Sequence, residues 1–216
     1  MKHTFLYMAT GMLFMLLCLS FVPATALAQE SEARQQLEST VNEVLKELQK
    51  PDMKSPDQRK VILNNIERVV ERMFDFDAFA QRIAGRAWRN FTPEQKTRFQ
   101  SAMKDLLREV YLEKLTGYSG ERVIFQGEGP TSDGKGVEIR TAITVRDKPV
   151  SVAYRMRKKN RWVVYDVVIE DSISLAESYY SQFRDLLAKN DIEKLIVHVE
   201  GKAVEMKEFN KKAQAR

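Results

Sequence analysis

Apolar residues recur at the spacing of an α-helix in the stretch that follows residue 31. The first helix is expected to end at Pro51, and its apolar positions are Leu37, Val41, Val44, Leu45 and Leu48. The second helix carries Ile62, Ile66, Val69, Val70 and Met73. A short third segment, FDFDAFAQRIAG, closes at Gly85. A fourth helix is expected to run to about Thr116, with an apolar face made of Phe99, Met103, Leu106, Leu107, Val110 and Tyr111.

The start of the fourth helix carries a capping signal. Thr92 is placed as the N-cap, Pro93 at the first helical position and Gln95 three residues after the cap. The second helix begins with the same pattern at Ser55, Pro56 and Gln58. In the third segment, Asp75 and Asp77 do not share a helix face, and one of them is expected to act as an N-cap.

The periodicity changes from helical to alternating near Arg122. One alternating run carries Val137, Ile139, Thr141, Ile143 and Val145, and the next carries Val150, Val152, Tyr154 and Met156. The turn RDKP separates the two runs. The stretch WVVYDVVIE is apolar on both faces, as in a central strand, and RVIFQ supplies a further strand. These strands, connected consecutively and antiparallel, predict a curved meander.

Helical periodicity returns after the strands. Ser174 is expected to cap a helix that carries Leu175, Tyr179, Phe183, Leu186 and Leu187. A last helix is expected around Leu195 to Val199, before a polar tail. Because the helices are segregated from the strands, the predicted fold is α+β, with a curved antiparallel sheet of about four strands packed against a helical layer.

The N-terminal segment predicts export. Lys2, an apolar run from Phe5 to Val22, and the small residues Ala26 and Ala28 match a signal peptide that is cleaved after Ala28. An uncleaved membrane anchor is the alternative, because the run approaches the ~20 residues that span a bilayer. The expected organisation is a cleaved signal peptide at 1–28, a single domain at 29–200 and a polar C-terminal tail at 201–216, with the mature protein in the periplasm.

The composition argues against several classes of chemistry. After cleavage, His198 is the only histidine and no cysteine remains. Zinc sites and Ser/His/Asp or Cys/His arrangements need several such residues, and His198 is expected to be an ordinary helix residue. The composition leaves an all-carboxylate site open, but neither a metal nor a cofactor is predicted. The chain has 35 Lys and Arg against 30 Asp and Glu. This modest basic excess does not predict nucleic-acid binding.

Two motifs invite a chemical interpretation. GEGPTSDGKG has the glycines and lysine of a phosphate loop, but it lies between two strands and is interpreted as a hairpin loop. Asp166, inside the last strand, is a candidate general base for a small-cavity enzyme, which would require a raised pKa and a positioned partner. An exported scaffold protein with a filled core is a further alternative.

A hairpin sequence, RMRKKNR, is strongly basic. The ordinary explanation is a solvated turn. The functional interpretation is a docking patch for anionic lipid or an acidic partner, formed by Arg155, Arg157, Lys158, Lys159 and Arg161.

Aromatic residues gather before and within the fourth helix. They are Phe74, Phe76, Phe79, Trp88, Phe91 and Phe99. Such clusters usually belong to a core, and the functional alternative is the wall of an apolar cavity.

Four stretches of the chain together resemble the MlaC family, also called the toluene-tolerance auxiliary family. They are FDFDAFAQRIAGRAWRNFTPEQKTRF, YLEKLTGYSGERV, WVVYDVVIED and SLAESYYSQF, and they occur in the order and spacing of that family. The resemblance extends from about Leu37 to Val199. Two positions depart from the family pattern: Ser172 stands where a glycine is expected, and Tyr180 where an arginine is expected.

The resemblance implies a soluble periplasmic phospholipid carrier without catalytic activity. Its acyl chains would lie in an apolar cavity between the curved sheet and the helices. Such carriers exchange phospholipid with an outer-membrane lipoprotein complex and an inner-membrane ABC transporter complex, and so maintain the lipid asymmetry of the outer membrane. The residues expected to line the cavity are Phe76, Phe79, Ile83, Trp88, Met103, Leu107, Tyr111, Ile139, Ile143, Val152, Tyr154, Leu175 and Tyr179.

Overall fold

The computed structural model of the chain describes residues 30–51, 55–145 and 148–214. The signal peptide expected at 1–28 and the first two residues of the RDKP turn lie outside these ranges.

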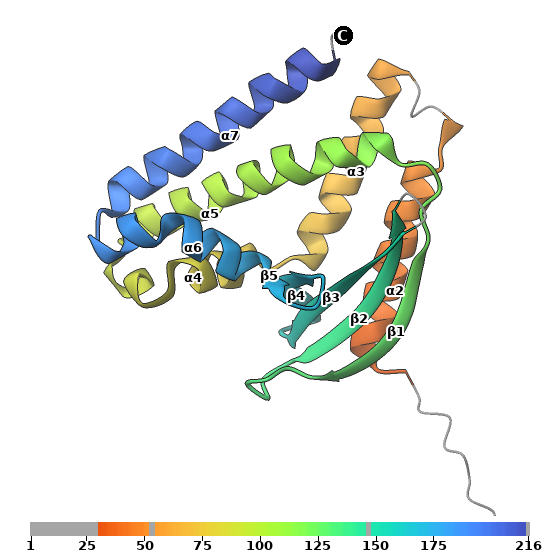
Figure 1. The fold of residues 1–216 in the computed structure, drawn as a ribbon, viewed down its shortest axis with the longest axis horizontal. Helices are drawn as coiled ribbons and strands as arrows, with labels where there is room; N and C mark the ends of the chain where they lie inside the picture. The colour runs from red at the N-terminus through yellow and green to blue at the C-terminus, as the bar shows by residue number, and fades with distance from the viewer. Residues whose placement is uncertain (1–29, 52–54, 146–147, 215–216) are drawn as a thin grey trace, which may run out of the picture. The chain divides into compact units, whose positions relative to one another are not determined.

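Helices precede and follow one run of strands (Figure 1). The N-terminal helical part consists of α2 (Glu32–Leu48), α3 (Pro56–Met73), α4 (Phe76–Ala84), the 3₁₀ helix η2 (Gly85–Asn90) and α5 (Pro93–Leu107). It ends in a π-helical turn, η3 (Arg108–Leu112), and a second 3₁₀ helix, η4 (Glu113–Gly117). The strands are β1 (Val123–Pro130), β2 (Val137–Val145), β3 (Lys148–Lys158), β4 (Trp162–Ile169) and β5 (Ile173–Ser174). The last helices are α6 (Leu175–Ala188) and α7 (Ile192–Gln214).

The strands form one antiparallel sheet in the order β1-β2-β3-β4-β5. Ile139 on β2 lies opposite Tyr154 on β3, which in turn lies opposite Val167 on β4. Side chains directly opposite one another point to the same face of a sheet. This face, called the inner face below, carries Phe125, Ile139, Thr141, Ile143, Val150, Val152, Tyr154 and Val167. The predicted α+β fold and meander are confirmed, and β5 is an additional short strand.

Helix α2 and the end of α3 pack against the inner face. Ala33 and Leu37 of α2 and Met73 of α3 are buried together with Ile139 and Met156 of the sheet. Main-chain contacts tie the same elements: the Asp75 N–H donates to the Val164 carbonyl at 2.7 Å, just beyond the end of α3. The sheet therefore positions the junction between α3 and α4.

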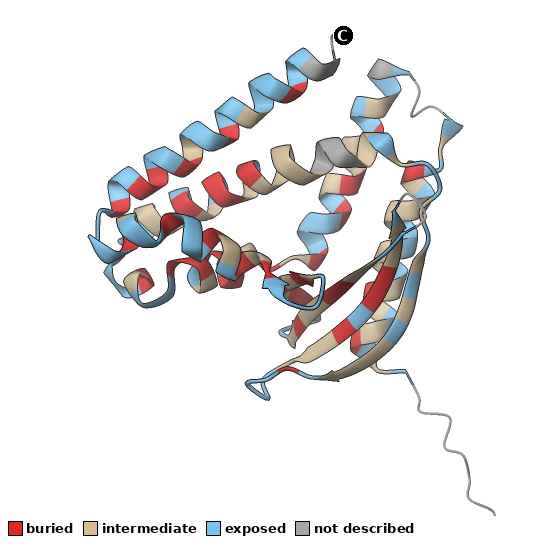
Figure 2. Cartoon of the chain, viewed as in Figure 1, coloured by how far each residue is buried: buried red, intermediate tan, exposed pale blue. Residues whose placement is uncertain are grey.

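The remaining helices form a layer of their own, in which α5 and α7 run side by side (Figure 1). Figure 2 shows buried residues along the side of α7 that is turned toward α5. Phe99 and Met103 of α5 are buried with Leu195, Ile196 and Val199 of α7. This packing makes α5 and α7 one structural unit.

Three predicted caps are confirmed. Thr92 and Gln95 form a complete capping box, with Gln95 N to Thr92 Oγ1 at 3.2 Å and Thr92 N to Gln95 Oε1 at 3.0 Å. Asp75 caps α4, and Ser174 caps α6. Helix α3 also begins where expected, although the Ser55 side chain makes no capping hydrogen bond.

Two helix ends differ from the prediction. Helix α5 ends at Leu107, short of Thr116, because the chain continues as the π-helical turn η3. The segment expected as a polar tail instead continues α7, in which Ala203 and Asn210 are buried. The Asn210 side chain donates to the Glu109 carbonyl in η3 at 2.8 Å, which supplies a reason for the helix to continue this far.

Candidate functional site

Buried apolar side chains fall into three clusters. The helical cluster joins α4, α5, α6 and α7, and the sheet cluster joins the sheet to α2 and the end of α3. The α2–α3 cluster consists of Leu48, Ile62 and Ile66, with Leu115 and Tyr118 among the side chains packed against it. A domain usually has one contiguous core. The buried side chains of the sheet and of the helical layer thus form separate clusters, with Phe74 packed against both.

One half of the inner face lies outside these clusters. Within the described residues, Ile143, Val150 and Val152 belong to none of the three. Ile143 lies opposite Val150 in the register, and both keep accessible surface. Ile139, on the same face of β2, is by contrast fully buried in the sheet cluster. The inner face thus changes along its strands from packed core to apolar surface outside the core.

The helical layer carries a corresponding set of apolar side chains. Leu107, Val110 and Leu175 pack against the helical cluster but keep accessible surface. Tyr111 in η3 is also partly accessible, and burial raises the pKa of its phenol. Burial raises the pKa of Tyr179 on α6 as well, with a further contribution from Tyr111. The two phenols therefore lie near one another, beside accessible apolar surface.

Tyr154 on the inner face has the same character. Burial raises the pKa of its phenol, and a hydrogen bond with Thr141 acts in the opposite direction. The Tyr154 side chain is nevertheless partly accessible. Tyr154 also packs against the sheet cluster, so it lies at the edge of the packed core.

The residues expected to bind lipid fall into two groups. One group is buried within the clusters and consists of Phe79, Ile83, Trp88, Met103, Ile139 and Tyr179. The other group keeps accessible surface or lies outside the clusters and consists of Phe76, Leu107, Tyr111, Ile143, Val152, Tyr154 and Leu175. Which of them contact a ligand stays a prediction.

Trp88 is part of a packed aromatic group. Its ring centroid lies 5.2 Å from that of Phe91 and 6.5 Å from that of Phe99, and Lys96 lies over the indole at 5.5 Å. The group joins η2 to the first turns of α5. The aromatic residues around the Thr92 cap therefore fix the start of α5.

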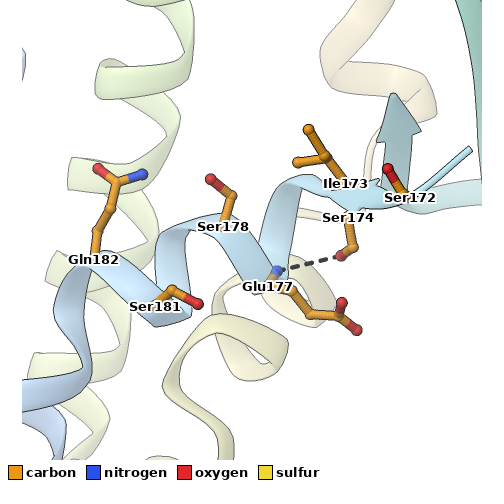
Figure 3. A pocket seen from close by; sticks show the side chains of 7 residues that line it. All are labelled: Ser172, Ile173, Ser174, Glu177, Ser178, Ser181 and Gln182. Atoms are coloured by element: carbon orange, nitrogen blue, oxygen red, sulfur yellow. Dashed lines mark hydrogen bonds between the residues drawn. The ribbon is translucent and has the colours of Figure 1, made fainter. Parts of the chain in front are cut away.

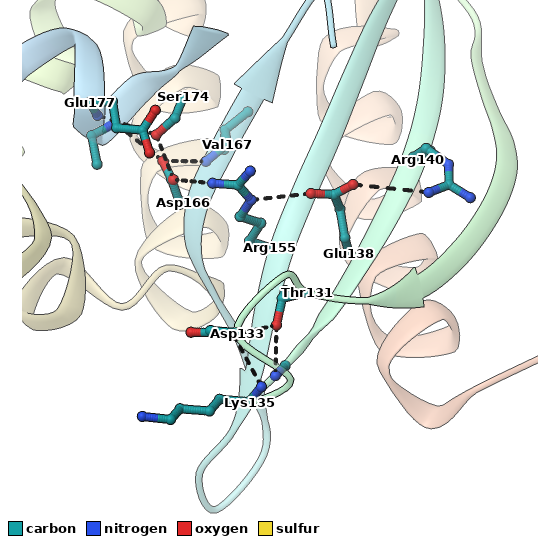
Figure 4. A network of polar contacts seen from close by, with 12 residues as sticks. Thr131, Asp133, Lys135, Glu138, Arg140, Arg155, Asp166, Val167, Ser174 and Glu177 are labelled. Atoms are coloured by element: carbon teal, nitrogen blue, oxygen red, sulfur yellow. Dashed lines mark hydrogen bonds and ion pairs between the residues drawn. The ribbon is translucent and has the colours of Figure 1, made fainter. Parts of the chain in front are cut away.

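Asp166 is fully buried and lies at the start of α6 (Figure 4). It accepts hydrogen bonds from the Ser174 hydroxyl at 2.7 Å and the Ala176 N–H at 3.2 Å. Arg82 Nε lies 3.0 Å and Arg155 Nη1 3.3 Å from its Oδ2 atom. These groups occupy both carboxylate oxygens, as in a structural acid that joins β4 to α6. A general base would instead need a free oxygen that faces a substrate.

The same ion-pair network continues across the sheet. Arg155 Nε lies 3.1 Å from Glu138 Oε2, and Arg140 Nη1 lies 4.0 Å from Glu138 Oε1 (Figure 4). Glu138 and Arg140 alternate with the inner-face residues of β2 and so point to the opposite face. Glu138, Arg140 and Arg155 are thereby kept apart from the apolar inner face.

Most cations of the basic hairpin are ion-paired. Arg157 Nε and Lys159 Nζ lie 2.9 Å and 2.7 Å from Asp75 Oδ2, and Lys158 Nζ lies 2.6 Å from Glu32 Oε2. Burial pushes the pKa of Asp75 upward, but hydrogen bonds from Lys159 and Arg157 outweigh it, and the pKa lies below its ordinary value. The hairpin thus connects the sheet to the start of α4, and its role in docking stays a prediction.

An open depression of about 530 Å³ lies along the start of α6 (Figure 3). The residues that line it are Ser172, Ile173, Ser174, Glu177, Ser178, Ser181 and Gln182, all of them polar or charged except Ile173. Tyr180 lies on the same helix and is 43% exposed. The two departures from the family pattern, Ser172 and Tyr180, therefore belong to the surface around α6 rather than to the inner face.

The described residues contain no group of three or more His, Cys, Asp or Glu placed to hold a metal ion. Among the helices described, none is both long and apolar enough to cross a membrane.

A family model described as MlaC protein matches residues 38–200. The chain belongs to the MlaC family. The matched region agrees with the resemblance drawn from about Leu37 to Val199, which is thereby confirmed.

The chain is similar to one curated relative and to one protein of solved structure. The intermembrane phospholipid transport system binding protein MlaC of Haemophilus influenzae is 25% identical over 134 residues, which are 60% of this chain and 62% of that protein. The match thus spans less than two thirds of the relative's length. A phospholipid-binding protein from Ralstonia solanacearum, solved in complex with a phospholipid, is 26% identical with a TM-score of 0.72. That likeness covers 82% of this chain and 99% of the other.

Some residues of the candidate site were not predicted from the sequence. Val110 and Val150 share the properties of the predicted lining, and the helical and alternating patterns both contain them. The role of Arg82 could not be predicted from its neighbours in the sequence, because its partner Asp166 lies far along the chain.

Proposed function

We propose that this member of the MlaC family is a phospholipid carrier that holds acyl chains between the inner face of the sheet and the helical layer. The supporting observation is the half of the inner face that carries Ile143, Val150 and Val152 outside the packed clusters. Leu107, Tyr111 and Leu175 would supply the opposite wall. The likeness to a protein solved with a phospholipid supports the same assignment.

The energetics favour a carrier that encloses both chains. Burial of each methylene is worth ~0.8 kcal/mol, so two chains with about thirty methylenes would cost on the order of 20 kcal/mol to expose in water. A protein that moves a phospholipid between membranes must therefore cover most of that surface. An apolar wall such as the half of the inner face that carries Ile143, Val150 and Val152 is suited to this task.

The transport role that follows is a shuttle across the periplasm, after removal of residues 1–28 as a signal peptide. The carrier would exchange phospholipid with an outer-membrane lipoprotein complex and an inner-membrane ABC transporter complex. This exchange would maintain the lipid asymmetry of the outer membrane. Arg155, Arg157, Lys158, Lys159 and Arg161 are the proposed docking residues, although most of their charge is compensated within the protein.

The test is extraction of the purified protein with organic solvent, followed by mass spectrometry. A stoichiometric amount of phospholipid is expected in the extract. Protein prepared under the same conditions with Ile143→Asn is the matched control and should carry much less. Wild-type protein that yields no phospholipid, and takes none up from vesicles, would favour a scaffold with a filled core.

A further inference from the structure

Two ion pairs join helix α3 to the end of α5 and to Arg108, the first residue of η3. Glu71 Oε1 lies 2.6 Å from Lys104 Nζ, and Glu67 Oε2 lies 3.3 Å from Arg108 Nε. The two glutamates are four residues apart in the sequence, and so are the two basic residues. Residues at this spacing lie on one side of a helix. The four side chains are 21–39% exposed. They form a ladder across the surface between α3 and α5, which is called the α3–α5 seam below.

The α3–α5 seam lacks the packing found at the other side of α5. The buried residues of α5, among them Phe99 and Met103, belong to the helical cluster that includes α7. Among the described residues of α3, Met73 belongs to the sheet cluster, and Ile62 and Ile66 belong to the α2–α3 cluster. The α5–α7 junction also carries surface ion pairs, from Arg98 to Glu193 and Glu200, but they lie over a shared core. The α3–α5 seam is therefore held mainly by its charges.

Apolar side chains of the proposed lipid site flank the ladder. Leu107 follows Lys104 at the helical spacing that places it on the same side of α5, Tyr111 lies in the adjoining turn η3, and both keep accessible surface. On α3, Val70 stands between the two glutamates and is 40% exposed. The ladder thus crosses apolar surface that is not closed by packing.

Packed residues mark the two ends of the seam. Phe74, at the end of α3, packs against the helical cluster, and Leu63 packs with Leu115 in the α2–α3 cluster. From Leu63 to Phe74 the helix rises roughly 16 Å at 1.5 Å per residue. This length accommodates the passage of an acyl chain.

We infer that the α3–α5 seam is the portal through which phospholipid enters and leaves, and that its two ion pairs are the latch. The inference rests on the proposed carrier function. Exposed ion pairs stabilise a structure weakly and are screened by salt, because water solvates the separated charges. Opening the α3–α5 seam therefore costs little, whereas separation of α5 from α7 would expose the helical cluster.

Cross-linking provides the direct test. On a Cys18→Ser background, the seam variant is Glu71→Cys with Lys104→Cys, and the control variant is Arg98→Cys with Glu200→Cys. Both replace an ion pair of α5, and both are joined by the same short bis-maleimide after loading with a fluorescent phosphatidylethanolamine. Transfer is measured into vesicles of phosphatidylethanolamine and phosphatidylglycerol. The cross-linked seam variant should transfer phospholipid about tenfold more slowly than its uncross-linked form, or slower still. Cross-linking should leave the transfer rate of the control variant unchanged.

The outcomes separate the portal from the carrier. If the uncross-linked protein carries phospholipid and the cross-linked seam variant transfers it at the control's rate, the portal is wrong and the carrier stands. If the uncross-linked protein binds no phospholipid at all, the carrier itself is wrong.

A second variant needs no cross-link. Glu67→Gln with Glu71→Gln weakens the latch and should speed transfer by roughly two- to fivefold, as expected for the loss of exposed ion pairs. Glu193→Gln with Glu200→Gln removes the corresponding carboxylates at α7 and should not change the rate. Slower or unchanged transfer in the first variant would contradict the latch.

Discussion

At the scale of single residues, the contacts of a side chain show whether it has a structural role or faces a ligand. Asp166 was a candidate for chemistry because a buried acid in an apolar strand is unusual. Its contacts with Ser174, Ala176, Arg82 and Arg155 instead give it the role of a joint between β4 and α6. The residue type alone did not distinguish these roles, because the distinction depends on partners from other elements.

Asp166→Asn should destabilise the fold. The substitution leaves Arg82 and Arg155 without their shared buried carboxylate, and loss of one partner of a buried ion pair costs about 3 kcal/mol or more. The measurement is the free energy of unfolding in urea. Asp185→Asn, at an exposed position on α6, is the control and should leave the urea midpoint unchanged. Equal midpoints for Asp166→Asn and wild type would contradict the structural role.

Ile143→Asn and Ile139→Asn should behave differently although both lie on the inner face of β2. Ile139 is fully buried in the sheet cluster, so an amide there should cost about 3 kcal/mol or more from lost packing and an unsatisfied polar group. Ile143 lies outside the clusters, and its variant should stay folded while losing bound phospholipid. Circular dichroism and lipid extraction measure the two effects. If Ile143→Asn unfolds as Ile139→Asn does, position 143 is ordinary core.

Among the secondary-structure elements, most helix caps could be predicted from local sequence, whereas two helix ends could not. The caps at Thr92, Asp75 and Ser174 could be predicted because each involves residues within one helical turn. The π-helical turn after Leu107 and the continuation of α7 to Asn210 depend on a contact between segments far apart in the chain. No periodicity contains that information.

The junction between the sheet and α4 should make stability depend on pH through Asp75. The pKa of Asp75 is lowered in the folded protein, so its charged form stabilises the fold above the ordinary value of about 3.9. This contribution is lost as the pH falls through the lower folded value. Unfolding free energies of wild type and Asp75→Asn, measured from pH 7 downward, should therefore converge in acid. A gap that is independent of pH would contradict the assignment.

Arg157→Gln tests whether the ion pair with Arg157 contributes to the lowered pKa of Asp75. It removes one of the groups that lower the pKa of Asp75 in the folded protein, so the pH-dependent loss of stability should be smaller than in wild type and should be complete at a higher pH. The direction of this shift distinguishes a specific ion pair from general acid unfolding.

In the molecule taken whole, the fold class and the family could be predicted more fully than the site. Alternating and helical patterns predicted the meander and the helices, because burial of one face imposes them. The same patterns cannot separate Ile139 from Ile143, since both are apolar residues at alternate positions of one strand. Their difference arises only when three clusters form and leave part of the inner face outside them.

Bound phospholipid should stabilise the whole domain. A ligand that binds only the folded state adds ~4 kcal/mol when its free concentration is about 1,000 times Kd. For a domain of this size such a gain raises the melting temperature by roughly 10 °C. Wild-type protein should therefore melt higher after loading from phosphatidylethanolamine vesicles than after delipidation. Ile143→Asn, taken through the same delipidation and loading, should show little difference between the two states, because its polar side chain disfavours the acyl chains. Identical melting of loaded and delipidated wild type would mean that the interior between sheet and helices is filled by the protein itself, and the carrier assignment would then fail.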